Sequence, residues 1–70
     1  MKNYYIAVTI RLDNKLASFV HKMSSNNNLL SLTDNTHVIC AMICESKKNA
    51  DFITNYWNQI YKEENRYLYE

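Results

Sequence analysis

The residues best suited to chemistry in this chain are two cysteines and two histidines, Cys40, Cys44, His37 and His21. Structural zinc sites usually take four ligands in closely spaced pairs, whereas His37 has the opposite strand parity to both cysteines. A nucleophilic cysteine needs an exposed thiolate beside an oriented base, and both cysteines lie in an apolar run. We therefore predict no metal site, no cofactor and no catalytic residue, and hence a protein that is not an enzyme.

The same two cysteines are too far apart to form a disulfide with each other. In an extended strand, residues four positions apart have Cα atoms roughly 13 Å apart, and a disulfide needs a Cα separation below about 7 Å. Cys40 and Cys44 are therefore expected to be free, buried thiols of a reducing compartment. We place the protein in the cytoplasm of a host cell.

A second group with chemical potential is Ser46, Lys47 and Lys48, which come directly before the most regular helical pattern of the chain. The unpaired N–H groups of a helix N-terminus can bind a phosphate or a carboxylate, and two lysines would strengthen such a site. Lysines at this end of a helix otherwise oppose the macrodipole at a small cost. We favour a solvated lysine pair and keep anion binding by these three residues as the alternative.

Tyrosine is the third residue type of interest, because it can stack on nucleic-acid bases or anchor a protein partner. The six tyrosines are Tyr4, Tyr5, Tyr56, Tyr61, Tyr67 and Tyr69. We expect about half of them to pack in the core or at its rim. The C-terminal members Tyr61, Tyr67 and Tyr69, together with Arg66, form the predicted partner-binding site.

Length and composition limit the remaining possibilities. Seventy residues make a single domain, 1–70, whose core supplies only a few kcal/mol of net stability. The formal net charge of +1 argues against both a basic nucleic-acid-binding domain and an acidic mimic of DNA. No leader peptide or membrane span is expected, because no segment approaches the roughly 20 apolar residues that a span needs.

The elements that must position these residues begin with two expected strands. Residues 4–12 alternate between two sets of side chains with a period of two, which is typical of a half-buried strand. Residues 15–23 fit both a helix and a strand, but Asp13 and Asn14 between the two runs indicate a tight hairpin. We therefore predict a strand over 15–23. With no glycine in the chain, asparagine and aspartate must supply any left-handed turn residue.

Two further segments lead to the last helix. Residues 28–34 are long enough for one or two helical turns, with Asn27 or Asn28 as N-cap. Residues 36–45 carry apolar side chains at both odd and even positions, which is typical of a strand covered on both faces or lying centrally in a sheet. The expected fold is α+β, a small antiparallel sheet in the order β-β-short α-β-α, with one C-terminal amphipathic helix packed on one face.

The last helix is the clearest element. Ser46 is a natural N-cap, and Asn65 can supply the left-handed residue that ends the helix. The expected core-facing stripe is Ala50, Ile53, Trp57 and Ile60, with Phe52, Tyr56 and Tyr61 at its edge. The expected outer side is Lys48, Asn55, Asn58, Lys62 and Glu63. The tail 66–70 alternates again and is expected to form a short edge strand or to pack beneath the helix.

Over most of its length, from the expected N-terminal hairpin through residues 28–30 to the last helix, the chain resembles a group of small phage, prophage and mobile-element proteins of low-GC Gram-positive bacteria. The matching positions are Ser46, Lys47, Lys48, Ala50, Trp57, Asn58, Tyr61 and Asn65. The chain departs from the group at Arg66, where the group usually has glycine. A weaker likeness, the "WNQ" followed by tyrosine and acidic residues, is to small anti-CRISPR inhibitors, although these are strongly acidic. The abundance of asparagine, lysine, isoleucine and tyrosine, which A/T-rich codons encode, agrees with such an origin.

Three functional hypotheses follow. The first is a non-enzymatic phage or mobile-element protein that binds and modulates a host macromolecule, a protein or a ribonucleoprotein. The resemblance points to an inhibitor of a bacterial immune system such as CRISPR-Cas. The second is a small nucleotide-binding or nucleic-acid-binding module, whose affinity would fall steeply with salt. The third is a homo-oligomeric structural module, such as a homodimer, which would self-associate without another partner.

Overall fold

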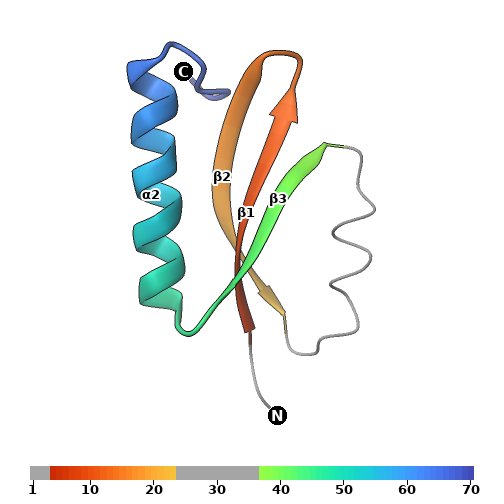
Figure 1. Cartoon of the computed structure of the whole chain (residues 1–70), viewed down its shortest axis with the longest axis vertical. Helices are drawn as coiled ribbons and strands as arrows, with labels where there is room; N and C mark the ends of the chain where they lie inside the picture. Colours follow the sequence, from red (N-terminus) through yellow and green to blue (C-terminus); the bar gives the residue numbers. More distant parts are fainter. Residues whose placement is uncertain (1–3, 24–36) are drawn as a thin grey trace.

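The computed structural model describes residues 4–23 and 37–70, which form a three-stranded antiparallel sheet and one helix (Figure 1). The elements are β1 (Tyr4–Leu12), β2 (Lys15–Met23), β3 (Val38–Cys44) and α2 (Lys47–Glu63). The strand order is β2-β1-β3, and α2 packs on one face of the sheet, mainly over β2 and β1. The expected α+β architecture is confirmed. The short helix expected over 28–34 lies outside the described residues.

The hairpin between β1 and β2 is formed as expected. Leu12 pairs with Lys15, so Asp13 and Asn14 make a two-residue turn. Asp13 has a positive φ of 58°, a conformation that asparagine and aspartate tolerate better than most residues. The strand interpretation of residues 15–23 is therefore correct, and the antiparallel pairing is regular along both strands.

The central strand of the sheet is β1, and it is buried on both faces. Ile6 and Val8 contact Met23 on the face away from α2. Ala7 packs with Ala50 and with the cysteine at the end of β3 on the helix side. The expectation of a half-buried strand is incomplete, because small side chains such as Ala7 leave room for the helix to approach this face closely.

The third strand does not lie centrally, and this corrects the expectation for residues 36–45. β3 is an edge strand, and its large side chains Ile39, Met42 and Ile43 are exposed. A register shift opposite Thr9 and Ile10 interrupts its pairing with β1 near Ile39. The apolar side chains on both faces of β3 are therefore only partly covered, because β3 lies at the edge of the sheet.

The C-terminal end of α2 is closed by its own backbone. Asn65 has a φ of 58°, and its N–H donates to the carbonyl of Lys62 at 3.1 Å. The N–H of Arg66 donates to the carbonyl of Tyr61 at 2.7 Å. These two bonds define a Schellman motif, with Asn65 in the left-handed position as expected.

The buried face of α2 is more polar than its apolar pattern indicates. Ala50 and Thr54 are buried, whereas Trp57 is only half-buried against the sheet. The Thr54 hydroxyl donates to the Ala50 carbonyl at 2.9 Å, so its burial leaves no unpaired donor. Asn58, which was expected on the outer side, faces β2 instead.

Asn58 and the C-terminal tail together cover the outer edge of β2. The Asn58 amide donates to the Ser18 carbonyl at 2.9 Å, and its oxygen accepts from the Ser18 N–H at 2.7 Å. Further along the edge, the Leu16 N–H donates to the Arg66 carbonyl, and the Leu68 N–H donates to the Leu16 carbonyl. The tail thus returns to β2, as Figure 1 shows at the C-terminus.

Candidate protein-binding surface

The two cysteines occupy different environments. Cys44 is buried, and its thiol donates to the Met42 carbonyl at 3.7 Å. Cys40 is exposed, so the expectation of two buried thiols is wrong for this residue, because edge strand β3 is open beside it. Within residues 4–23 and 37–70, no three His, Cys, Asp or Glu side chains gather closely enough to hold a metal ion.

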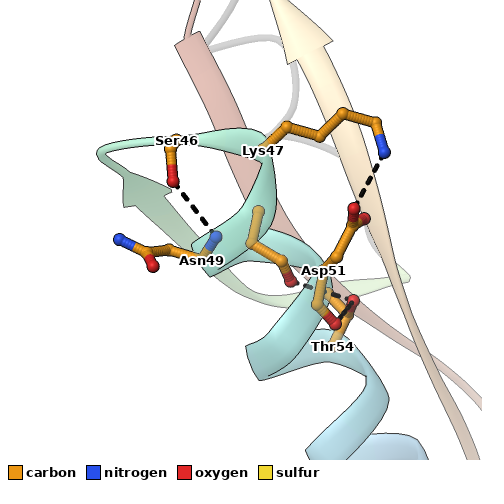
Figure 2. Close-up of polar contacts among 6 residues, drawn as sticks. Ser46, Lys47, Asn49, Asp51 and Thr54 are labelled. Atoms are coloured by element: carbon orange, nitrogen blue, oxygen red, sulfur yellow. Dashed lines mark hydrogen bonds and ion pairs between the residues drawn. The ribbon is translucent and has the colours of Figure 1, made fainter.

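Ser46 and Lys47, two of the three residues considered for anion binding, lie at the N-terminus of α2 (Figure 2). The Ser46 hydroxyl accepts from the Asn49 N–H at 3.2 Å, which makes Ser46 the N-cap. Lys47 forms an ion pair with Asp51 at 2.8 Å. The hydrogen bond to this carboxylate, followed by its charge, raises the pKa of Lys47. Both side chains thus already have partners, and anion binding by Ser46, Lys47 and the exposed Lys48 stays a prediction.

The predicted tyrosine site at the C-terminus is partly engaged with the rest of the fold. Tyr67 forms an isolated parallel bridge with Leu16 of β2. Its ring lies 5.0 Å from the Lys62 ammonium and 5.9 Å from the Tyr69 ring, which it meets edge-on. Tyr67 and Tyr61 are half-buried, and Arg66 and Tyr69 are exposed.

This arrangement sets a limit on the tail as a binding site. The backbone around Tyr67 closes the edge of β2, and the Tyr67 ring already contacts Lys62 and Tyr69. Tyr69 exposes the larger part of its side chain and is the member of the predicted site best placed to reach a partner. The four predicted residues do lie in one region, at the C-terminal end of α2 and just beyond it.

Exposed apolar side chains also lie on β3 and on the flank of α2 that meets the end of this strand. Phe52 is 73% exposed and Tyr56 is 60% exposed, and they occupy positions four apart on the helix. Met42 and Ile43 of β3 are 41% and 54% exposed. We call these four residues the β3–α2 surface.

A depression of about 280 Å³ marks the meeting point of the two elements. Its lining consists of Met42, Ile43, Cys44, Glu45, Asn49, Phe52 and Ile53. Small-molecule sites usually have volumes of roughly 300–1,000 Å³ and bury most of the ligand. The depression lies at the lower end of this range, and the exposed Ile43 and Phe52 at its wall can contact an apolar group of a protein partner.

The charge on this surface is low and peripheral. Glu45 and Asn49 supply the polar groups of the depression, and Met42, Ile43 and Phe52 supply its apolar walls. An apolar centre with a polar rim is the usual anatomy of a protein interface.

The sequence contains a signal for the helical part of this surface. Phe52 and Tyr56 fall at the edge of the helical stripe, four residues apart, so they lie next to each other on one flank. The sequence does not show that β3 is an edge strand, so the contribution of Met42 and Ile43 could not be predicted.

In the part of the chain that the structure describes, no helix is long and apolar enough to cross a lipid bilayer. No protein-family model, no curated protein and no solved structure matches this chain.

Proposed function

We propose that this chain is a non-enzymatic protein of phage or mobile-element type that binds a host protein through the β3–α2 surface. The observation that carries the proposal is the exposure of two aromatic rings, Phe52 and Tyr56, on one flank of a helix. Large apolar groups of this kind, exposed beside one another, commonly mark an interaction surface. Aromatic residues are also enriched among those that dominate binding energy.

The local chemistry supports a protein partner more than a nucleic acid. The walls of the depression are apolar, and the acidic Glu45 lies at its rim. The nearest lysine of the first helical turn, Lys47, is paired with Asp51. A phosphate backbone would meet few unpaired cations on this side, whereas an apolar anchor from a protein would displace water from Phe52 and Met42.

The biological class of the partner is proposed from the resemblance alone. Small phage-type proteins and anti-CRISPR inhibitors share features with the C-terminal half of this chain, so we propose a bacterial immune protein or ribonucleoprotein as the target. Binding without turnover suffices for such a role, because an inhibitor acts by occupying a surface of its target.

The proposal is tested by affinity capture from lysates of a low-GC Gram-positive host, followed by mass spectrometry and measurement of Kd for the captured protein. Phe52→Ser combined with Tyr56→Ser should weaken binding at least tenfold, as expected when interface anchors are removed. Tyr69→Ser is the matched control, because Tyr69 has a similar exposure of 68% but lies outside the β3–α2 surface.

Two other outcomes would favour the earlier hypotheses. If the Tyr67→Ala and Tyr69→Ala pair abolishes binding while the Phe52 and Tyr56 variant binds normally, the C-terminal tyrosine site is the interface. If binding falls steeply with salt and is lost on replacing Lys47 and Lys48, the anion-binding alternative is correct. Circular dichroism of each variant verifies that the fold is retained.

A further inference from the structure

The two edges of the sheet are treated differently. The outer edge of β2 is covered by the Asn58 amide at Ser18 and by the tail at Leu16. The outer edge of β3 is the other edge of the sheet, because the strand order is β2-β1-β3. An uncovered edge presents a row of N–H and C=O groups that can pair with another strand.

The hydrogen bonds at Ser18 show which groups of β3 face outward. Ser18 uses its N–H and C=O for Asn58, so its pair with Thr9 is not hydrogen-bonded, and Thr9 points its own groups toward β3. Thr9 pairs with Cys40. Backbone groups alternate in direction along a strand, so the N–H and C=O groups of Cys40, Met42 and Cys44 point toward β1.

The backbone N–H and C=O groups of the residues between them therefore point away from β1, toward the outer edge of the sheet. Ala41 and Ile43 each direct one N–H and one C=O outward from β3. No residue of the described ranges 4–23 and 37–70 supplies a partner for these four groups. The pairing of β1 with β3 is regular from Cys40 to Cys44, so Ala41 and Ile43 lie on an undistorted part of the strand.

This edge lacks the features that usually prevent strands from pairing with one another. β3 has the sequence VICAMIC, with no charged residue and no proline, whereas natural edges are often protected by lysine, proline or a bulge. The one irregularity, near Ile39, lies outside the regular segment. The open edge is apolar on both of its faces.

We propose that β3 pairs with β3 of a second copy of this chain, antiparallel and around a two-fold axis at Met42. The pairing would join two three-stranded sheets into one continuous six-stranded sheet. In this register Ala41 lies opposite Ile43 of the second copy, and the two exchange both of their backbone hydrogen bonds. The two-fold axis repeats this pair, which satisfies all the outward-facing groups named above.

The side chains of this register are complementary on both faces. On the face away from α2, the small Ala41 lies beside the exposed Ile43 of the second copy, so a large group meets a small one. On the helix face, Met42 meets Met42 of the second copy, and methionine adapts its shape to such contacts. Side-chain pairs that lie directly opposite each other on neighbouring strands stabilise the pairing of those strands.

Charge favours a second copy as the occupant. The seam is uncharged on both sides, so identical strands meet without like charges opposite one another. The net charge of +1 gives only weak repulsion between two copies. A small domain also gains from association, because its core is small: among the described residues the largest fully buried side chains are Ile6 and Val8.

The dimer seam and the proposed host-binding surface share Met42 and Ile43 of β3, but the aromatic anchors of host binding lie outside the seam. Phe52 and Tyr56 lie on α2, outside the strand seam. The two-fold axis leaves both copies of α2 on the same face of the six-stranded sheet, with their β3–α2 surfaces facing each other across the seam. Loss of the host-binding function and loss of the dimer can therefore be measured separately.

The first test is the mass of the protein in solution, measured by analytical ultracentrifugation over a range of concentrations. The wild-type protein should be a dimer, and Ala41→Pro should weaken the dimer at least tenfold, because proline removes an outward-facing N–H without removing a bond to β1. Lys22→Pro is the matched control at an outward-facing position of β2 and should leave the dimer intact. A wild-type protein that stays monomeric at concentrations on the order of 1 mM would overturn the proposal.

The second test fixes the register and does not depend on the proline variants. In the proposed dimer the two Met42 Cα atoms are about 4.5 Å apart, within the roughly 4.4–6.8 Å range of disulfides. Met42→Cys combined with Cys40→Ser should form a cross-linked dimer under mild oxidation, seen on non-reducing gels. Asn55→Cys combined with Cys40→Ser is the control and should remain uncross-linked. Equal cross-linking of both variants, or none at Met42, would contradict the β3 pairing.

Discussion

Replacing Asn58 with alanine should reveal how much one side chain contributes to closing the sheet. The Asn58 amide makes two hydrogen bonds to the backbone of Ser18, of 2.7 and 2.9 Å, and Ser18 is buried. A hydrogen bond contributes about 0.5–1.5 kcal/mol net, so the two together should contribute about 1–3 kcal/mol to the free energy of unfolding.

Helix propensity must be separated from this effect. Alanine favours a helix by up to about 0.7 kcal/mol relative to asparagine, which would mask part of the loss at Asn58. Asn55→Ala supplies the matched control, because Asn55 lies on the same helix and is exposed. The difference between the two variants in urea unfolding should be about 1–3 kcal/mol, and each kcal/mol should lower Tm by about 4–8 °C. A difference below about 0.5 kcal/mol would refute the structural role of this amide.

The isosteric change Asn58→Asp adds a dependence on pH. A carboxylate can still accept from the Ser18 N–H, but its second oxygen faces the Ser18 carbonyl and repels it, whereas a protonated carboxyl donates there. The folded state should therefore raise the pKa of the new carboxyl above its unfolded value of about 3.9. The carboxyl then stabilises the folded state most when the pH is below the unfolded pKa, and this stabilisation is lost as the pH rises through the folded pKa. Unfolding curves at several pH values should show this loss in the variant and not in the wild type.

Two further perturbations test the core and the hairpin turn. Trp57→Ala should lower the free energy of unfolding, measured in urea, by about 2–3 kcal/mol. This is less than the roughly 3–5 kcal/mol lost with a fully buried aromatic, because Trp57 is half-buried. An unchanged free energy of unfolding would mean that the Trp57 ring does not pack on the sheet. Asp13→Gly should raise the free energy of unfolding slightly, because Asp13 has a positive φ, which glycine adopts without steric cost. Asn14→Gly should give no such gain in thermal melts, and the reverse order of the two variants would contradict the turn geometry.

The sequence by itself determined the elements and several of their ends. The alternation of residues 4–12 and the Asx pair after it record the local preferences of a strand and a tight turn, which act over a few residues. Ser46 and Asn65 likewise mark the ends of α2 through bonds to their immediate neighbours. These features were predictable because the groups that satisfy each other are close in the chain.

Part of the candidate site followed from the same local patterns. The spacing of Phe52 and Tyr56 places both rings on one flank of the helix before any packing is known. The position of Ser46 as N-cap was also predictable, although the pairing of Lys47 with Asp51 was overlooked. What these residues face could not be inferred, since that depends on which strand lies beside the flank.

The tertiary structure alone decided the order of the strands and which side chains of the strands and of α2 are covered. β1 is central and β3 is at an edge, whereas the sequence predicted a half-buried strand over 4–12 and a covered or central strand over 36–45. Periodicity shows which side chains share a face of a strand, but not which strands lie beside it. Asn58 looked like a solvent-facing residue until Ser18, 40 positions away in the chain, supplied both of its partners. Strand neighbours and long-range polar pairs arise from contacts distant in sequence, so only the folded chain determines them.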